Sequence, residues 1–293
     1  MWFVFALITS LVNAFYFICS QFSKLKADLF IVYRGFIAAL VTTPLIFVFP
    51  INFPWEFYGV ILFQGFAISY MDYCYFKAFH KYGAENVNAI TPLSVIITFS
   101  LWLLIDPNIV QVYLQTPYRS LLIVLSIIAI IFSVIKYQNK PIGLRCLKYV
   151  FPILFISSLT DISNKIIMNH ANNHIIIASI YRVALTGWII GIINTLGCIK
   201  KGYAIKEVFN TENFNKSLFI VLLILSMISL NLAMYYTPNP AYCSAIIYMS
   251  VIWIMVINQI RFIYGYKSIH QQIERKWIFS LLFAAIVLVL VTN

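Results

Sequence analysis

Ten apolar runs follow one another along this chain, separated by short stretches that hold charges, proline or asparagine. A helix needs about twenty apolar residues to cross the hydrocarbon core of a bilayer. Backbone groups in lipid must find their partners inside the segment, so each run is predicted to be a helix. The predicted spans are Trp2 to Ser20, Leu29 to Val48, Phe57 to His80, Val87 to Ile105, Leu121 to Ile135, Val150 to Met168, Ile175 to Leu196, Leu218 to Tyr236, Ala241 to Ile260 and Trp277 to Val291.

The composition indicates which solvent surrounds these helices. Of the 293 residues, 62% are hydrophobic and 10% are charged, too little polar surface to cover a water-soluble fold. The chain is therefore predicted to be an all-α polytopic membrane protein in contact with the lipid bilayer. Its net charge of +11 lies in short tracts between the runs, where Lys and Arg set orientation, so nucleic acid is not expected as a partner.

The first run is expected to stay in the protein, because Met1 is followed directly by apolar residues with no basic segment and no small-residue cleavage site. The cysteines are odd in number and scattered, which fits no zinc, redox or disulfide pattern and predicts buried free thiols. They are Cys19, Cys74, Cys146, Cys198 and Cys243.

The chain carries an internal similarity. Much of the stretch from Leu7 to Arg34 recurs from Phe155 to Arg182, with Asn13 aligned to Asp161, and each stretch ends in a Tyr-Arg pair. Such similarity at a fixed spacing predicts that one unit has been duplicated.

A later match supports the duplication, because Ala89-Ile90 reappears as Ala245-Ile246 with the spacing widened by eight residues. The predicted organisation is one integral membrane domain with a first five-helix repeat at 1–140 and a second at 141–293. Five is an odd number of spans, so the second repeat enters the membrane from the opposite face, and an inverted-topology repeat is expected.

The loop charges predict the orientation. Lys and Arg follow the odd-numbered helices, whereas Arg119 alone lies between the others. The positive-inside rule places the odd loops in the cytoplasm and both termini outside the inner (plasma) membrane. The basic residues of the odd loops are Lys24, Lys26, Lys81, Lys136, Lys140, Arg145, Lys148, Lys200, Lys201, Lys206, Lys216, Arg261, Lys267, Arg275 and Lys276.

Two polar residues stand near the middle of corresponding spans. Asn13 lies in the first predicted helix and Asp161 in the sixth. An ionisable group at such depth is costly unless it is paired or lines a cavity, which makes both residues candidates for binding a substrate. The alternative is that Lys165, four residues after Asp161, neutralises it within the helix.

The third, fourth and ninth spans add further candidates. Gln64, Asp72 and Tyr75 lie near one face of the third span, and Asp72 has no partner in its own helix. Pro92 frees a carbonyl in the fourth span and permits either a functional bend or an inert kink. Its counterpart in the ninth span is Tyr248, with Ser244 before it and Trp253 after it.

Arg34 and Arg182 approach the bundle from opposite faces if the repeats are inverted. Each guanidinium suits a substrate carboxylate or a gate, and the alternative is that it ties helices together. An aromatic cage for a cation is a further hypothesis. Its candidate members are Tyr33, Tyr73, Tyr75, Tyr181, Tyr248 and Trp253.

No metal or cofactor site is expected. His170 and His174 are four apart, but they lie in an Asn-rich turn with Asn169, Asn172 and Asn173 and no nearby carboxylate. No nucleotide loop or nucleophile motif occurs, so the chain is not expected to be an enzyme.

These features together resemble the drug/metabolite transporter superfamily, specifically its EamA-type members. The resemblance rests on ten spans in two inverted halves, on Arg34 and Arg182 early in the second and seventh spans, on the small polar stretch opening each half, and on the Ala-rich start of helices four and nine. It spans the whole chain, and Asp106 stands where the family often has an acidic residue. The chain lacks the family's Gly-rich pattern around helices five and ten, and the family's usual orientation is opposite to that of the loop charges.

The resemblance implies a secondary transporter with a central cavity and alternating access between the halves. The residues suggest a small polar metabolite, an amino acid or related zwitterion, moved by a monomer or homodimer with a coupling proton or counter-substrate. Asp72, Asp161 or Asn13 would bind cationic or hydroxyl groups, and Arg34 or Arg182 a carboxylate. The alternatives are a transporter of a quaternary amine such as choline, a flippase for a lipid-linked sugar, and a non-transporting membrane enzyme or scaffold.

Overall fold

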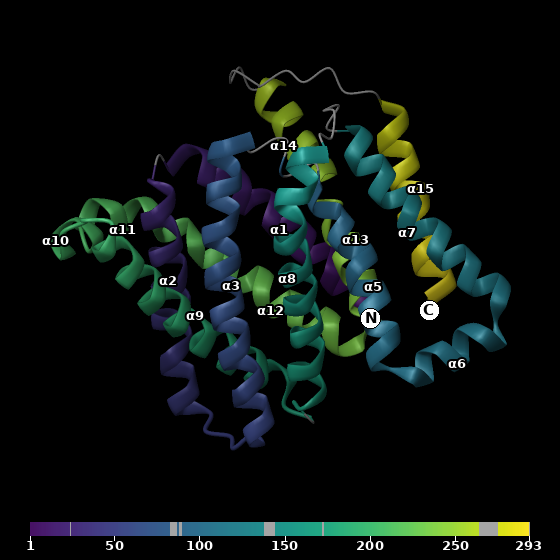
Figure 1. Cartoon of the computed structure of the whole chain (residues 1–293), viewed down its shortest axis with the longest axis horizontal. Coiled ribbons are helices and arrows are strands. Elements are labelled where there is room, and N and C mark those ends of the chain that lie inside the picture. Colours follow the sequence, from purple (N-terminus) through teal and green to yellow (C-terminus); the bar gives the residue numbers. More distant parts are fainter. Residues whose placement is uncertain are drawn as a thin grey trace.

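A computed structural model describes residues 1–23, 25–82, 87, 90–137, 144–171, 173–263 and 275–292, and every regular element in these ranges is a helix (Figure 1). The prediction of an all-α protein is confirmed. The elements are α1 (Trp2–Ser23), α2 (Ala27–Val48), α3 (Trp55–Tyr82), the 3-10 helix η1 (Thr91–Leu93), α5 (Ser94–Ile105), α6 (Pro107–Gln115), α7 (Pro117–Tyr137), α8 (Leu144–Asn169), α9 (Ile175–Lys200), α10 (Ile205–Val208), α11 (Thr211–Ser217), the 3-10 helix η2 (Leu218–Ile220), α12 (Val221–Tyr236), α13 (Pro240–Ile247), α14 (Ser250–Ile263) and α15 (Arg275–Thr292). Outside the described residues lie Lys24, Ala89, Lys140, Asn172, Lys267 and the expected boundary between residues 140 and 141.

Several helices are long and apolar enough to cross a bilayer. Seven meet this condition within the described ranges, or eight if the bent pair of α5 and α6 is one span. The helix at Trp277–Thr292 is apolar but shorter, and α3, which carries Gln64 and Asp72, is not among the seven. The chain therefore has the helices of a multi-pass membrane protein.

The bundle is built from helix pairs that are distant in the sequence. α2 packs along α9, α1 along α12, α3 along α8, and α7 along α15. α2 and α9 approach most closely because glycines face each other. A Cβ placed on Gly35 would lie 2.3 Å from the Gly191 nitrogen and 2.7 Å from the Gly187 oxygen. Small residues permit such backbone contact between membrane helices.

Two of the predicted spans contain a local break in their α-helical hydrogen bonding. In the fourth, Pro92 lies in η1, which leads directly into α5, and the helical run from Thr91 to Ile105 then bends by 101° into α6. Proline lacks the N–H that continues a helical ladder, so the 3-10 turn at Pro92 has a local cause. In the ninth, a turn at Tyr248 and Met249, which no proline or glycine marks, separates α13 from α14, but the predicted apolar run is confirmed as one span from Pro240 to Ile257.

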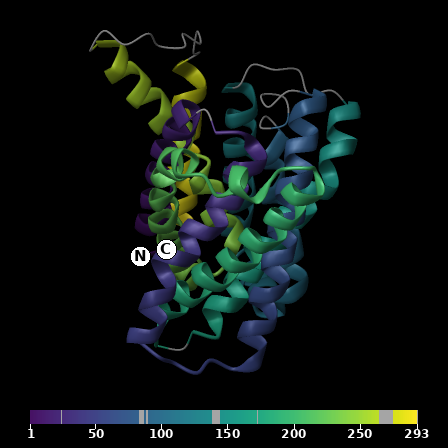
Figure 2. The same cartoon turned by 90° about the vertical axis from the view of Figure 1, so that its left-hand side faces the viewer.

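The helix ends sort to two ends of the bundle. Figures 1 and 2 show the loop that joins α2 to α3 at one end, and the end of α14 with the start of α15 at the other. The short helices α10 and α11 lie beside α2 and α9 near the second end. All five cysteines are free thiols; Cys146, Cys198 and Cys243 are buried as predicted, whereas Cys19 and Cys74 are half-buried.

Candidate functional site

Arg34 of α2 and Asp72 of α3 form an ion pair inside the bundle. The Arg34 Nη1 donates to Asp72 Oδ1 at 3.3 Å and lies 3.2 Å from Oδ2. Both side chains are largely shielded, with 19% of Arg34 and 8% of Asp72 exposed. The partner that Asp72 lacks in its own helix therefore comes from the neighbouring one, and this arginine ties two helices together.

Arg182 of α9 is held by neutral side chains. Its Nε donates to Gln64 Oε1 of α3 at 2.8 Å, and its Nη1 donates to Asn231 Oδ1 of α12 at 2.7 Å. Gln64 continues the network to α8, because its Nε2 donates to Asn164 Oδ1 at 2.7 Å and to the Thr160 carbonyl at 3.1 Å. Arg182 is 3% exposed, so this buried guanidinium of α9 connects, directly or through Gln64, polar groups of three other helices, α3, α8 and α12.

Asp161 of α8 accepts a hydrogen bond at 2.7 Å from the hydroxyl of Ser244 in α13. Lys165 donates instead to the carbonyl oxygen of Tyr235 at 3.0 Å. The alternative that Lys165 neutralises Asp161 within the helix is therefore wrong. Lys165 thus caps the C-terminal end of α12, where the last carbonyls of a helix have no partner within the helix itself.

The two broken spans meet at their breaks. Tyr248, in the gap between α13 and α14, donates its hydroxyl to the Thr91 carbonyl of η1 at 2.9 Å. The Ser94 hydroxyl lies 3.3 Å from the same Tyr248 oxygen. Ser158 of α8 donates to the Ser94 carbonyl at 2.9 Å, so α8 joins the contact between the breaks.

Asn13 lies apart from its counterpart Asp161. It is in α1 and accepts from the Ser226 hydroxyl of α12 at 2.6 Å. α1 also reaches α12 through Thr9, whose hydroxyl lies 3.5 Å from the Ser226 carbonyl. The structure thus gives Asn13 a place in the α1–α12 contact.

The aromatic candidates do not converge on one point. The Tyr33 hydroxyl donates to the Val208 carbonyl at 2.7 Å and accepts from the Asn210 amide at 3.2 Å, next to α10. The Tyr181 hydroxyl accepts from the Ile51 amide at 3.0 Å, at the α2–α3 loop. These two anchor points lie at opposite ends of the bundle (Figure 1). Tyr73 is half exposed, so the six-member cage does not form as one cluster.

Tyr75 and Trp253 remain as candidates near the breaks. Tyr75 belongs to α3 and lies within electrostatic range of Tyr248 and Asp161. The Trp253 indole nitrogen is buried and finds no hydrogen-bond partner among the described residues. A buried N–H of this kind is costly unless a ligand or water accepts from it.

The structure brings most of the candidates into two neighbouring groups. One contains Gln64 and Arg182, and the other contains Asp161, Ser244, Tyr248 and Tyr75. The sequence interpretation missed the two residues that hold these groups in place, Asn231 and Ser94. Asn231 carried a usable signal, because it is an amide within the apolar run of α12.

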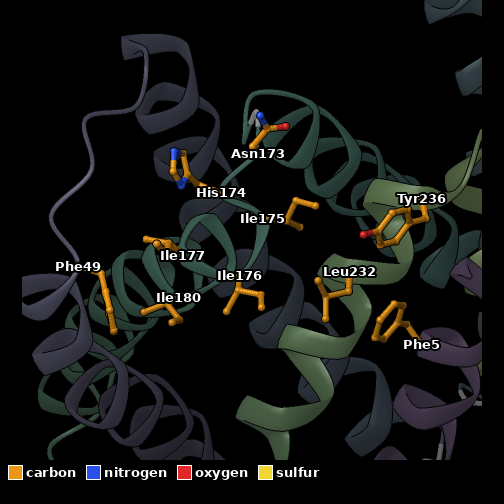
Figure 3. Close-up of a pocket in the computed structure, with 10 residues that line it drawn as sticks. All are labelled: Phe5, Phe49, Asn173, His174, Ile175, Ile176, Ile177, Ile180, Leu232 and Tyr236. Atoms are coloured by element: carbon orange, nitrogen blue, oxygen red, sulfur yellow. The ribbon is translucent and has the colours of Figure 1, made fainter.

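The pocket drawn in Figure 3 lies elsewhere. It has a volume of about 610 Å³ and lies between the starts of α1 and α9, the end of α12 and the chain after α2. Isoleucines of α9 make up much of its lining, together with the polar side chains of Asn173, His174 and Tyr236. None of the predicted substrate-binding residues lines it, so this apolar pocket is distinct from the buried polar groups.

Within the described ranges, no three His, Cys, Asp or Glu side chains gather closely enough to hold a metal ion. His170 turns a ring nitrogen to the Ile166 carbonyl of its own helix at 2.8 Å. Comparison with known proteins finds no family model that matches this chain and no curated protein that matches it.

Proposed function

We propose that this protein is a secondary transporter of a small polar metabolite, an amino acid or related zwitterion, with ten spans in two inverted halves. The observation that carries the proposal is the set of four charged side chains inside apolar helices, Arg34, Asp72, Asp161 and Arg182. Ionisable residues at membrane depth are costly and usually line the path of a polar substrate.

The pairing of helices supports the inverted repeat. In two five-helix halves, α1 and α3 of the first correspond to α8 and α12 of the second. If the two halves are exchanged, α1 takes the place of α8 and α12 that of α3. The α1–α12 contact therefore corresponds to the α8–α3 contact, and both are among the most extensive in the bundle. Likewise α2 corresponds to its partner α9, and α7 to its partner α15. An approximate two-fold axis relating the halves accounts for all four pairings.

The two broken spans support a transport mechanism. Discontinuous helices at the interface of two repeats expose backbone carbonyls near the middle of the membrane, where transporters bind substrate. Here η1 and the α13–α14 break touch through Tyr248 and Thr91, beside Asp161. Rocking of one half against the other, pivoting on the glycine contact of α2 and α9, would expose the substrate to each side in turn.

The orientation that we propose places the ends of α3, α7, α9 and α14 in the cytoplasm and both termini outside. Lys81, Lys136 and Lys201 lie at or near three of these ends. The positive-inside rule supports this arrangement for an inner (plasma) membrane. The test is a C-terminal fusion to a reporter that works only outside the cytoplasm. We expect this fusion to be active. An inactive fusion would indicate the opposite orientation.

Uptake by reconstituted vesicles tests the proposal. Purified protein is placed in liposomes, and the entry of labelled amino acids, quaternary amines, nucleosides and sugar phosphates is measured against empty liposomes. We expect uptake of one class, and its loss when Asp161 is replaced by Asn. A membrane enzyme or scaffold predicts no uptake of any compound and no effect of Asp161→Asn.

A second candidate, a flippase for a lipid-linked sugar, is favoured by the pocket of Figure 3. Its rim carries exposed apolar side chains, Ile176, Phe49 and Tyr236, of the kind that face lipid in a membrane protein. Such a pocket suits an acyl or prenyl chain entering from the side. This function predicts that bulky substitution of Ile176 by Trp blocks lipid translocation, while the proposed metabolite uptake tolerates the change.

A further inference from the structure

The two corresponding arginines differ in their charge partners. Arg34 pairs with the carboxylate of Asp72. Among the residues that the structure describes, the Arg182 side chain donates to the neutral amides of Gln64 and Asn231 and to no carboxylate. Its Nη2 makes no hydrogen bond within the described part of the chain, and it is not among the fully buried atoms that lack a partner. The second arginine is thus oriented by neutral groups and keeps one nitrogen for another acceptor.

Asp161 has a matching vacancy. Its Oδ2 accepts from Ser244, while its Oδ1 makes no hydrogen bond to any residue that the structure describes. Asp161 and Arg182 lie within electrostatic range of each other, but no ion pair joins these two described residues. An acceptor oxygen and a donor nitrogen of opposite charge are therefore held in the same half of the protein and kept apart.

The two halves distribute the same charges differently. Where the first half has Asn13, the second has Asp161, at the same distance in sequence from the arginine. In the contact between the second and third helices of each half, the first half has Asp72 and the second has Asn231. Each half thus carries one Arg and one Asp in these positions. The two form an ion pair in the first half and do not in the second.

From this asymmetry we propose that the second half binds a zwitterion, its carboxylate on Arg182 and its ammonium on Asp161, while Arg34–Asp72 is a structural pair. The inference rests on the proposed transport function and assigns its substrate groups. Arg donates a planar pair of N–H groups that suits a carboxylate, and bonds between charged partners are the strong ones in a buried site. A zwitterion neutralises both vacant charges at once, which neither a cation nor an anion does.

Substitution at Asn231 gives the sharpest test. Asn231→Asp copies the first half by giving Arg182 its own carboxylate, and Asn231→Ser is the matched control that adds no charge. Binding is measured by the thermal unfolding midpoint of purified protein titrated separately with each of the common neutral L-amino acids and with glycine betaine. We expect Asn231→Asp to weaken zwitterion binding about ten- to a hundredfold, the worth of a charge-assisted hydrogen bond, and Asn231→Ser to weaken it severalfold less. Equal effects of the two substitutions, or none, overturn the assignment.

Ligand analogues test each end separately. For the amino acid that stabilises the protein most, the amide lacks the carboxylate and the deaminated acid lacks the ammonium. Both are expected to bind at least about tenfold more weakly to the native chain. In Asp161→Asn the deaminated acid should bind as well as the amino acid itself, which keeps the proposal testable if Asn231→Asp does not fold. A preference for the amino acid that survives in Asp161→Asn contradicts the role of Asp161.

The outcomes separate this inference from the proposed function. Uptake of a nucleoside or a sugar phosphate, without stabilisation by any zwitterion, overturns the inference and leaves transport standing. Zwitterion binding that responds to Asn231→Asp, without uptake into vesicles, supports the inference and overturns transport.

Discussion

The hydroxyl of Tyr248 donates a 2.9 Å hydrogen bond to the carbonyl oxygen of Thr91, and this bond joins the breaks of two helices that are 157 residues apart in sequence. Thr91 belongs to η1, where Pro92 interrupts the ladder, and Tyr248 lies between α13 and α14. The Thr91 carbonyl also accepts from the Ser94 backbone N–H of its own turn. The Tyr248 hydroxyl therefore adds a second donor, which links the two spans.

Replacement of Tyr248 by Phe should destabilise the protein by about 1 kcal/mol or more, because the Thr91 carbonyl and the Ser94 hydroxyl both lose a partner. The free energy of unfolding in detergent is the measurement. Tyr118→Phe is the control, since Tyr118 is 86% exposed. A Tyr248→Phe protein as stable as the Tyr118→Phe protein would show that the bond between the breaks contributes nothing.

The α2–α9 contact should not tolerate a methyl group. Gly35→Ala places a Cβ 2.3 Å from the Gly191 nitrogen, and a backbone atom cannot turn aside as a side chain does. Overpacking of this kind costs about 1 to 3 kcal/mol, measured as unfolding free energy.

Gly197→Ala is the matched control for Gly35→Ala. It lies in α9, and its Cβ would meet nothing within 4 Å. Because alanine is the better helix former, this change should be neutral or stabilise by up to about 1 kcal/mol. Equal stability of the two variants would mean that α2 and α9 do not touch at Gly35.

The two tyrosines of the repeated Tyr-Arg pairs should protect different amides. The Asn210 amide donates to Tyr33, and the Ile51 amide donates to Tyr181. Tyr33→Phe should speed hydrogen exchange at Asn210 and leave Ile51 unchanged, and Tyr181→Phe should do the reverse. Each variant serves as the control of the other. Exchange that rises at both amides in either variant would indicate general loosening rather than two separate anchors.

A pH dependence should arise at the end of α9. The Asp28 carboxylate, 2.6 Å from Lys201 Nζ, raises the pKa of Lys201 above its usual value. Because the pKa of Lys201 is higher in the folded state, the ion pair contributes fully to the free energy of unfolding below the pKa of an unfolded lysine, about 10.4. This contribution is lost as pH rises through the pKa of Lys201 in the folded protein. The difference in unfolding free energy between the native chain and Lys201→Met should therefore shrink above about pH 10, from at most about 1 kcal/mol for so exposed a pair. A constant difference between pH 8 and 11.5 would exclude this ion pair as its source.

Much of the fold followed from local pattern. The helices at Trp2–Ser23 and Ala27–Val48 lie where apolar runs predicted them, because a segment in lipid must satisfy its own backbone. The 3-10 turn at Pro92 was equally local. The turn at Tyr248 was not, because no proline or glycine marks it and its contact to Thr91 lies in the other half.

The candidate site shows the same division. The sequence by itself determined that Arg34, Asp72, Asp161 and Arg182 lie within apolar helices, since polar residues in such runs are visible one at a time. Only the tertiary structure decided that Asp72 forms an ion pair with Arg34, while Arg182 receives the neutral amide of Asn231 in place of a carboxylate. Which charges meet depends on how helices distant in the chain pack and turn their faces. That packing is a property of pairs of helices, and no single run encodes it.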